Sequence, residues 1–186
     1  MKVLAINGSP RKNGNTSIII KAVCEELNKE NIETEIISLS DKKIDGCISC
    51  YMCRTVRNGK CAVDLDDFMN IYEKMLVADG ILLGSPTYFS DVTSEMKALI
   101  DRAGFVNKNN DYPLRYKVGA AVVSARRAGA IHTFDTLLHF FSGCQMIIPT
   151  TPGWGMVIGE PKTDEEGMRN MSLLGKNMAW LLKRIQ

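Results

Sequence analysis

Short apolar segments alternate with amphipathic helical patterns along almost the whole chain of 186 residues. Continuous apolar runs at 80–84 and 118–123 are typical of parallel strands that are covered on both faces. Because parallel neighbours need a crossover connection, usually a helix, this alternation predicts a doubly wound α/β sheet. The hydrophobic content of 45% supports one compact domain that spans residues 1–186.

The expected elements follow from apolar periodicity and from helix start signals. The expected strands are 2–6, 34–38, 80–84, 118–123 and 146–149, and the expected helices are 16–28, 66–77, 94–103, 131–142 and 163–185. The last helix is predicted to open with a capping box from Thr163 to Glu166. Five parallel strands fit the flavodoxin-like order 2-1-3-4-5, which we expect from the strand count alone.

The charges exclude several classes of partner. The net charge is +2 and both signs are spread along the chain, so no basic stripe predicts nucleic-acid binding and no polybasic helix predicts membrane binding. The chain enters its first strand directly, and no apolar run reaches the roughly 20 residues that a membrane span needs. We therefore expect a cytoplasmic protein that acts on small molecules.

The first strand-to-helix loop has the composition of an anion site. In a doubly wound sheet such loops lie at the carboxyl edge, where ligands bind. The segment GSPRKNGNTS contains Gly8 and Gly14, and it leads to the free amides at a helix start. The candidate phosphate ligands are Ser9, Arg11, Asn15, Thr16 and Ser17. An ordinary helix cap is the alternative; a triphosphate-binding loop is excluded because Asn15 stands where that motif needs Lys.

The loops after the third and fourth strands have side chains suited to a heteroaromatic ring. The former exposes rings and backbone amides at Pro86, Thr87, Tyr88 and Phe89. The latter offers groups for a ring carbonyl, a flavin anion or a dinucleotide phosphate at Ser124, Arg126, Arg127 and Gly129. The alternatives are aromatic caps on the core and solvated arginines. We expect His132 and His139 to be structural or to face a partner.

A cysteine-rich loop at about 40–63 follows the second strand. It contains Cys47, Cys50, Cys53 and Cys61, whereas Cys24 and Cys144 stand apart as small apolar residues. Thiolates are soft ligands, so the spacing is compatible with an iron-sulfur cluster or zinc. Unligated redox thiols are the third interpretation.

Together these motifs resemble a known family. GSPRKNGNT, the four cysteines ahead of DLDDF, ADGILLGSPTYF, MKALIDR and SARRAG are similar to the iron-sulfur flavoproteins within the flavodoxin-like NAD(P)H-dependent FMN reductase superfamily. The resemblance implies FMN, with its phosphate on the first loop and its ring against 86–89 and 124–129. It also implies a [4Fe-4S] cluster on the four clustered cysteines, and a homodimer or homotetramer that brings cluster and flavin close.

The resulting hypothesis is an FMN-dependent oxidoreductase that passes electrons from NAD(P)H or a reduced iron-sulfur protein such as ferredoxin to an acceptor. Flavin supplies the hydride chemistry, so no catalytic acid or base is expected. The alternatives are a cluster-free FMN, quinone or nitro reductase, a flavodoxin-type carrier and a redox sensor. The slightly basic charge disfavours the carrier. Exposed aromatic residues near the flavin edge, including Phe140, Phe141 and Trp154, are a further reason to expect an oligomer.

Overall fold

The computed structural model describes residues 1–185 and contains a five-stranded parallel sheet with the order β2-β1-β3-β4-β5. This confirms the order expected from the sequence. The strands are β1 (Lys2–Asn7), β2 (Glu33–Ser38), β3 (Gly80–Pro86), β4 (Val118–Ala125) and β5 (Met156–Ile158). The helices are α1 (Asn15–Lys29), α2 (Met52–Val56), α3 (Phe68–Val77), α4 (Ser94–Asn109), α5 (Ala130–Gly143) and α6 (Glu165–Ile185).

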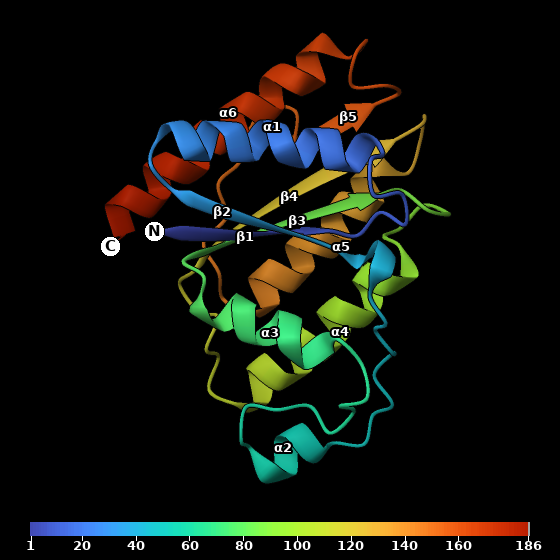
Figure 1. Ribbon diagram of the computed structural model, residues 1–186, viewed down its shortest axis with the longest axis vertical. Helices are drawn as coiled ribbons and strands as arrows, with labels where there is room; N and C mark the ends of the chain where they lie inside the picture. Colours follow the sequence, from blue (N-terminus) through green and yellow to red (C-terminus); the bar gives the residue numbers. More distant parts are fainter. Residues whose placement is uncertain (186) are drawn as a thin grey trace.

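Two helical layers cover the sheet, with α1 and α6 on one face and α3, α4 and α5 on the other (Figure 1). Successive residues of a strand point to opposite faces. Val3 and Ala5 therefore pack with α1 and α6, whereas Leu4 and Ile6 pack with α3 to α5. Because both faces are buried, the central strands are apolar at almost every position.

The fifth strand lies later in the chain than the sequence predicted. The segment 146–149 forms only an isolated bridge, in which Ile147 pairs with the start of β4 at Val118. Pro149 follows and has no amide hydrogen to continue the pairing. The chain then turns and returns to the same strand at Met156, opposite Val123. The edge of the sheet is thus an interrupted strand, of which only the second part is long enough to count as β5.

Helix α6 begins with a different cap from the one expected. Asp164 Oδ1 accepts a hydrogen bond from the amide of Gly167 at 2.9 Å, and Oδ2 accepts one from the amide of Ile158 at 2.8 Å. Thr163 instead donates its hydroxyl to Glu160 O. Asp164 is therefore the capping residue, and it also ties α6 to β5.

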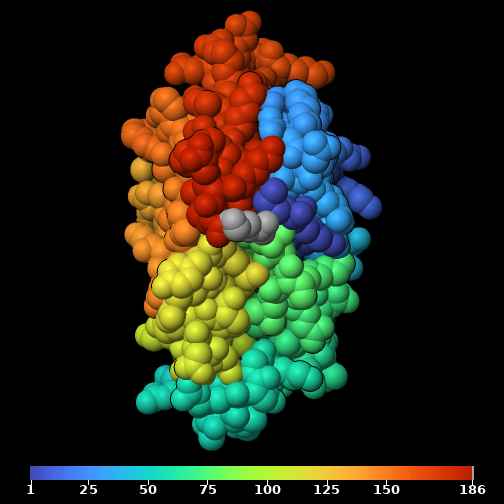
Figure 2. Space-filling view, turned by 90° about the vertical axis from the view of Figure 1, so that its left-hand side faces the viewer, coloured from blue at the N-terminus to red at the C-terminus, as the bar shows by residue number. Residues whose placement is uncertain are grey.

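The cysteine-rich segment leaves the sheet after β2 and runs down the outside of the α3 and α4 layer. It includes a short 3₁₀ turn (Leu39–Asp41) and α2, which lies at the far end of the molecule from α6 and α1 (Figure 1). In Figure 2 its cyan atoms form one end of the elongated molecule. Among residues 1–185, none of the helices combines the length and the apolar character that a membrane crossing needs.

Candidate functional site

Three strand-to-helix loops meet at the carboxyl edge of the sheet. The amide of Gly8 donates to Gly84 O at 2.8 Å, and the amide of Thr87 donates to Ser124 O at 2.9 Å. The hydroxyls of Thr16 and Ser124 lie 2.9 Å apart, buried from solvent. These bonds join the first loop to the third and fourth, as the sequence predicted.

The first loop is folded tightly around its own side chains. The amide of Ser9 donates to Asn7 Oδ1 at 3.0 Å, and the amide of Arg11 donates to Ser9 Oγ at 3.1 Å. Gly14 precedes α1 and has no side chain to cap its first amides. Thr16 and Ser17 are buried at this helix start. Arg11 and Asn15 remain exposed beside them, so donors and one positive charge surround the start of the helix.

The third loop presents an aromatic turn to solvent. Tyr88 and Asp91 exchange two backbone hydrogen bonds of 2.8 and 3.1 Å. The two residues between them, Phe89 and Ser90, have φ angles of 49° and 69°. Both lie in the left-handed region, which is the geometry of a type I′ turn and is unusual for a residue as bulky as Phe89. The ring of Phe89 is fully exposed and Tyr88 is about half exposed.

The fourth loop packs against the third at a glycine. Gly129 has a φ of 85°, and a Cβ atom there would lie 2.9 Å from Ser90 Cα and 3.0 Å from Thr87 Cγ2. Thr133 holds the same contact from α5, because its hydroxyl donates to Gly129 O and bonds to the hydroxyl of Thr87 at 3.0 Å. Only glycine allows the two loops to approach this closely.

The remaining predicted residues of these loops also lie at the carboxyl edge. Pro86 ends β3 at half burial, and Ser124 is buried at the end of β4, whereas Arg126 and Arg127 are exposed. Asp91 was not predicted as a site residue; it accepts a hydrogen bond from Thr136 Oγ at 2.7 Å and lies 3.7 Å from His132 Nε2. Its place directly after the aromatic turn was the available signal.

The four clustered cysteines lie in a different place from these loops. Cys47, Cys50, Cys53 and Cys61 line one small cavity of about 20 Å³ together with α4 residues Arg102, Phe105 and Val106. Burial raises the pKa of the Cys53 thiol, and the nearby thiol of Cys61 raises it further. The expectation that all four informative loops share one edge is therefore wrong for the thiols, because their segment turns away along the outer helices.

The chemistry of the four thiols is that of a soft metal site. Within residues 1–185, no three His, Cys, Asp or Glu side chains are close enough to hold a single ion. Arg102 also lines the cavity, and its buried Nε has no hydrogen-bond partner in the described chain. Four soft donors and a polar group without a partner suit a sulfide-containing cluster.

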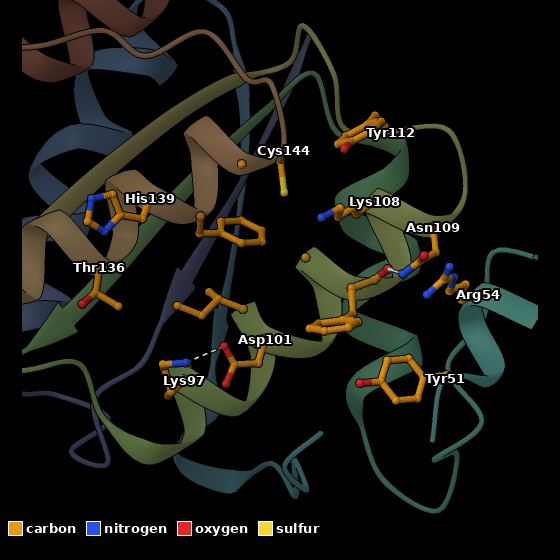
Figure 3. A pocket seen from close by; sticks show the side chains of 15 residues that line it. Tyr51, Arg54, Lys97, Asp101, Lys108, Asn109, Tyr112, Thr136, His139 and Cys144 are labelled. Carbon is orange, nitrogen blue, oxygen red and sulfur yellow. Dashed lines mark hydrogen bonds and ion pairs between the residues drawn. The ribbon is translucent and has the colours of Figure 1, made fainter. Parts of the chain in front are cut away.

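A second cavity of about 880 Å³ lies between α4, α5 and the cysteine-rich segment (Figure 3). Tyr51 and Arg54 reach it from the cysteine-rich segment, and the Lys97–Asp101 ion pair lies on its α4 side. His139 lines it from α5. Phe140 also lines it with little exposure, and Phe141 is fully buried in the core. Neither ring belongs to the flavin edge, so that part of the argument for an oligomer is wrong.

The sequence matches the family described as NADPH-dependent FMN reductase over residues 1–160. It is 39% identical over 197 aligned positions to an iron-sulfur flavoprotein of Methanocaldococcus jannaschii, with 100% of both chains covered. It is 32% identical over 192 positions to the iron-sulfur flavoprotein of Methanosarcina thermophila. That alignment covers 100% of this chain and 97% of the relative.

Solved structures share the fold. RosB with a bound 8-demethyl-8-formylriboflavin-5′-phosphate intermediate matches with a TM-score of 0.82 at 21% identity, over 100% of this chain and 80% of that chain. An NAD(P)H:quinone oxidoreductase from Methanothermobacter marburgensis matches with a TM-score of 0.71 at 15% identity, over 96% of each chain. The family match identifies a flavin-dependent reductase that binds FMN. The chain therefore belongs to the NADPH-dependent FMN reductase family, among its iron-sulfur flavoproteins.

Proposed function

We propose that FMN binds where the first, third and fourth loops meet. The start of α1 would hold the phosphate through free amides, the side chains of Ser9, Asn15, Thr16 and Ser17, and the charge of Arg11. The ring would lie against the 86–89 turn and the 124–129 loop. The Thr16–Ser124 hydrogen bond carries this proposal, because it joins the phosphate loop to the ring loop in one buried contact.

The third and fourth loops supply the walls of the proposed ring site. Tyr88 and Phe89 offer exposed aromatic faces, and the close Gly129 contact holds this turn against the next loop. Arg126 and Arg127 are exposed on the same loop, where a positive charge would favour the anionic form of a bound ring. When bound, the flavin accepts a hydride at N5 and supplies the redox chemistry itself.

We also propose that Cys47, Cys50, Cys53 and Cys61 hold a [4Fe-4S] cluster. Their shared cavity and their soft donor atoms support this assignment, and so do the relatives, which are named iron-sulfur flavoproteins. Such a centre accepts single electrons, so the chain would connect two-electron transfer from NAD(P)H with one-electron partners such as ferredoxin.

The two proposed sites lie apart on one subunit. Thr93 and Met96 of the α4 start contact the first loop, whereas Arg102 and Val106 of the same helix line the thiol cavity. Arg102 lies eight positions after Ser94, which is an axial rise of about 12 Å along the helix. This separation supports a homodimer or homotetramer in which the thiols of one subunit approach the flavin loops of its partner.

Protein produced and reconstituted without oxygen tests these assignments. The expected result is released FMN by chromatography, together with about four irons and four sulfides per chain. Cys50→Ser is expected to lose the iron and keep FMN, and the buried Cys24→Ala variant is the matched control that keeps both. Mainly FAD would overturn the phosphate site. Iron-free protein that oxidises NAD(P)H at the full rate would instead favour the cluster-free reductase.

A further inference from the structure

Arg102 and Asp66 form an ion pair that is hidden completely from solvent. Both side chains have 0% exposure, although the rest of the buried face of α4 is mainly apolar. Burying two charges removes their hydration, and such a pair is on average a weak source of stability. The stability of the core alone therefore does not account for a buried guanidinium at this position.

The guanidinium contacts the chain on both sides of the clustered cysteines. Nη1 donates to Asp45 O at 3.1 Å and to the carboxylate of Asp66, and Nη2 donates to Val63 O. Asp45 precedes the first clustered cysteine and Val63 follows the last. The ring of Phe68 lies 4.0 Å from the guanidinium carbon and covers its face.

Two of the three aspartates of the DLDDF motif, Asp66 and Asp67, complete this closure. Asp66 Oδ2 accepts a hydrogen bond from the amide of Asp45 at 2.8 Å, and Oδ1 accepts one from the amide of Phe68 at 3.2 Å. Asp67 and Lys43 exchange two further bonds of 2.9 and 3.0 Å. None of these contacts uses a cysteine sulfur, so none of them depends on the atoms that would bind a metal.

The same guanidinium borders the thiols. Arg102 lines the cavity that the four cysteines share. A guanidinium stays charged in proteins, and the buried carboxylate of Asp66 pairs with it. A permanent positive charge therefore lies directly against the proposed ligand set.

We propose that Arg102 is a positioning residue that, with Asp66, closes the cysteine-rich loop before a metal binds and holds a fixed positive charge beside the thiols. The charge part of this inference rests on the proposed cluster; the closure part does not. A closed loop has already lost the chain entropy that metal binding would otherwise have to overcome. A nearby cation favours the reduced centre, which has one more negative charge, and so raises its reduction potential.

Hydrogen exchange of the metal-free protein tests the closure. In wild-type protein we expect measurable protection of the amides of Asp45 and Asp67, with at least tenfold faster exchange in Arg102→Met. Asp101→Asn, which breaks an exposed ion pair at the position just before Arg102 in α4, is the matched control and should leave this protection unchanged. Equal protection in Arg102→Met and wild type would overturn the closure. Retained FMN binding verifies that each variant is folded.

The reduction potential of the reconstituted cluster tests the charge. Arg102→Met should lower the ratio of reduced to oxidised centre at a given potential about tenfold, which corresponds to about 59 mV for one electron. Asp66→Asn should shift the potential in the opposite direction, because it leaves the guanidinium uncompensated. A merely structural role would shift both variants the same way, and that result, or no shift, would overturn the charge assignment.

A third variant separates the two effects and covers a folding failure of Arg102→Met. Arg102→Lys keeps the charge but cannot reach Asp45 and Val63 with one planar fork. Arg102→Lys should lose the protection of the amides of Asp45 and Asp67. The reduction potential of its cluster should be closer to that of wild type than to that of Arg102→Met. Amide protection equal to wild type in Arg102→Lys would count against the closure. If wild-type protein takes up no iron, the proposed cluster fails, while the exchange experiment still decides the closure.

Discussion

At the scale of single residues, Thr16 gives the most direct test of the phosphate site. Its buried hydroxyl joins two of the proposed flavin loops. Thr16→Asp would place a negative charge at the proposed phosphate site, and two like charges about 5 Å apart repel by about 3 kcal/mol at an effective dielectric of 20. FMN affinity, measured by fluorescence titration, should fall about hundredfold. Thr16→Ser is the control that keeps the hydroxyl, and wild-type affinity in the Asp variant would contradict the site.

The buried thiol of Cys144 gives a prediction about pH. Burial raises its pKa from 9.0 to about 12. Because the unfolded thiol ionises first, the unfolded chain binds fewer protons above pH 9, and stability is lost between about pH 9 and pH 12. At pH 10 the loss should be about 1 kcal/mol for this group. Between pH 8 and pH 10, the urea midpoint of unfolding should therefore fall less in Cys144→Ala than in wild type. Equal decreases in the two proteins would contradict the prediction.

At the scale of elements, the turn between β3 and α4 holds an exposed aromatic ring in a backbone conformation that lowers the stability of the fold. Phe89 has a φ of 49°, and left-handed backbone costs an ordinary residue about 1–2 kcal/mol. Asparagine tolerates this conformation, so Phe89→Asn should raise the free energy of unfolding of the flavin-free protein by about 1 kcal/mol. The same variant should bind FMN more weakly if the ring contacts the flavin. Urea unfolding that shows no gain would argue against strain in this turn.

The start of α6 gives a second prediction at this scale. Asp164→Ala removes the hydrogen bonds to Gly167 and Ile158 and should cost about 1–2 kcal/mol of unfolding free energy. Thr163→Ala removes only an exposed bond to Glu160 and should change stability by less than about 0.5 kcal/mol. Thermal unfolding of the two variants compares the two candidate caps. A larger loss of unfolding free energy in Thr163→Ala than in Asp164→Ala would show that Thr163 is the capping residue.

The strands that run through the centre of the sheet could be predicted because burial on both faces makes them apolar throughout. The position of the edge strand could not be predicted. The segment 146–149 is as apolar as a strand, but it pairs with β4 only through Ile147, before Pro149. Likewise Thr163 and Asp164 are both acceptable caps by residue type, and only the position of Ile158 favours Asp164. Local pattern identifies the elements, but tertiary contacts choose between equivalent neighbours.

The candidate site shows the same division. The loops of the flavin edge follow from the topology, because every loop after a parallel strand begins at that edge and these three are short. The course of the cysteine-rich segment has no such rule, since it lacks regular periodicity between β2 and α3. Its path depends on Arg102, a residue type that is usually exposed and that the sequence analysis treated as part of an ordinary helix.

At the scale of the whole molecule, the distance between thiols and flavin loops predicts complementation between subunits. Thr16→Asp should lack flavin and Cys50→Ser should lack the cluster, so each variant alone should fail in electron transfer from NAD(P)H to ferredoxin. If the partner completes the pathway, half of randomly mixed dimers contain one intact pair, and about one quarter of wild-type activity should return.

Light scattering of the mixture and of wild type provides the control, because both should be at least dimeric at micromolar concentration. Activity that stays absent in a verified mixed oligomer would show that each subunit uses its own two sites.

Helix α4 restricts how this chain can vary in length. Thr93 at its start donates to Gly8 O at 2.7 Å, and Arg102 nine positions later holds Asp45 and Val63. One inserted residue between them would turn Arg102 by about 100° around the helix axis. An insertion or deletion between Thr93 and Arg102 should therefore break either the contact with the first loop or the closure of the cysteine-rich loop, and we expect homologous chains to keep the length of this segment.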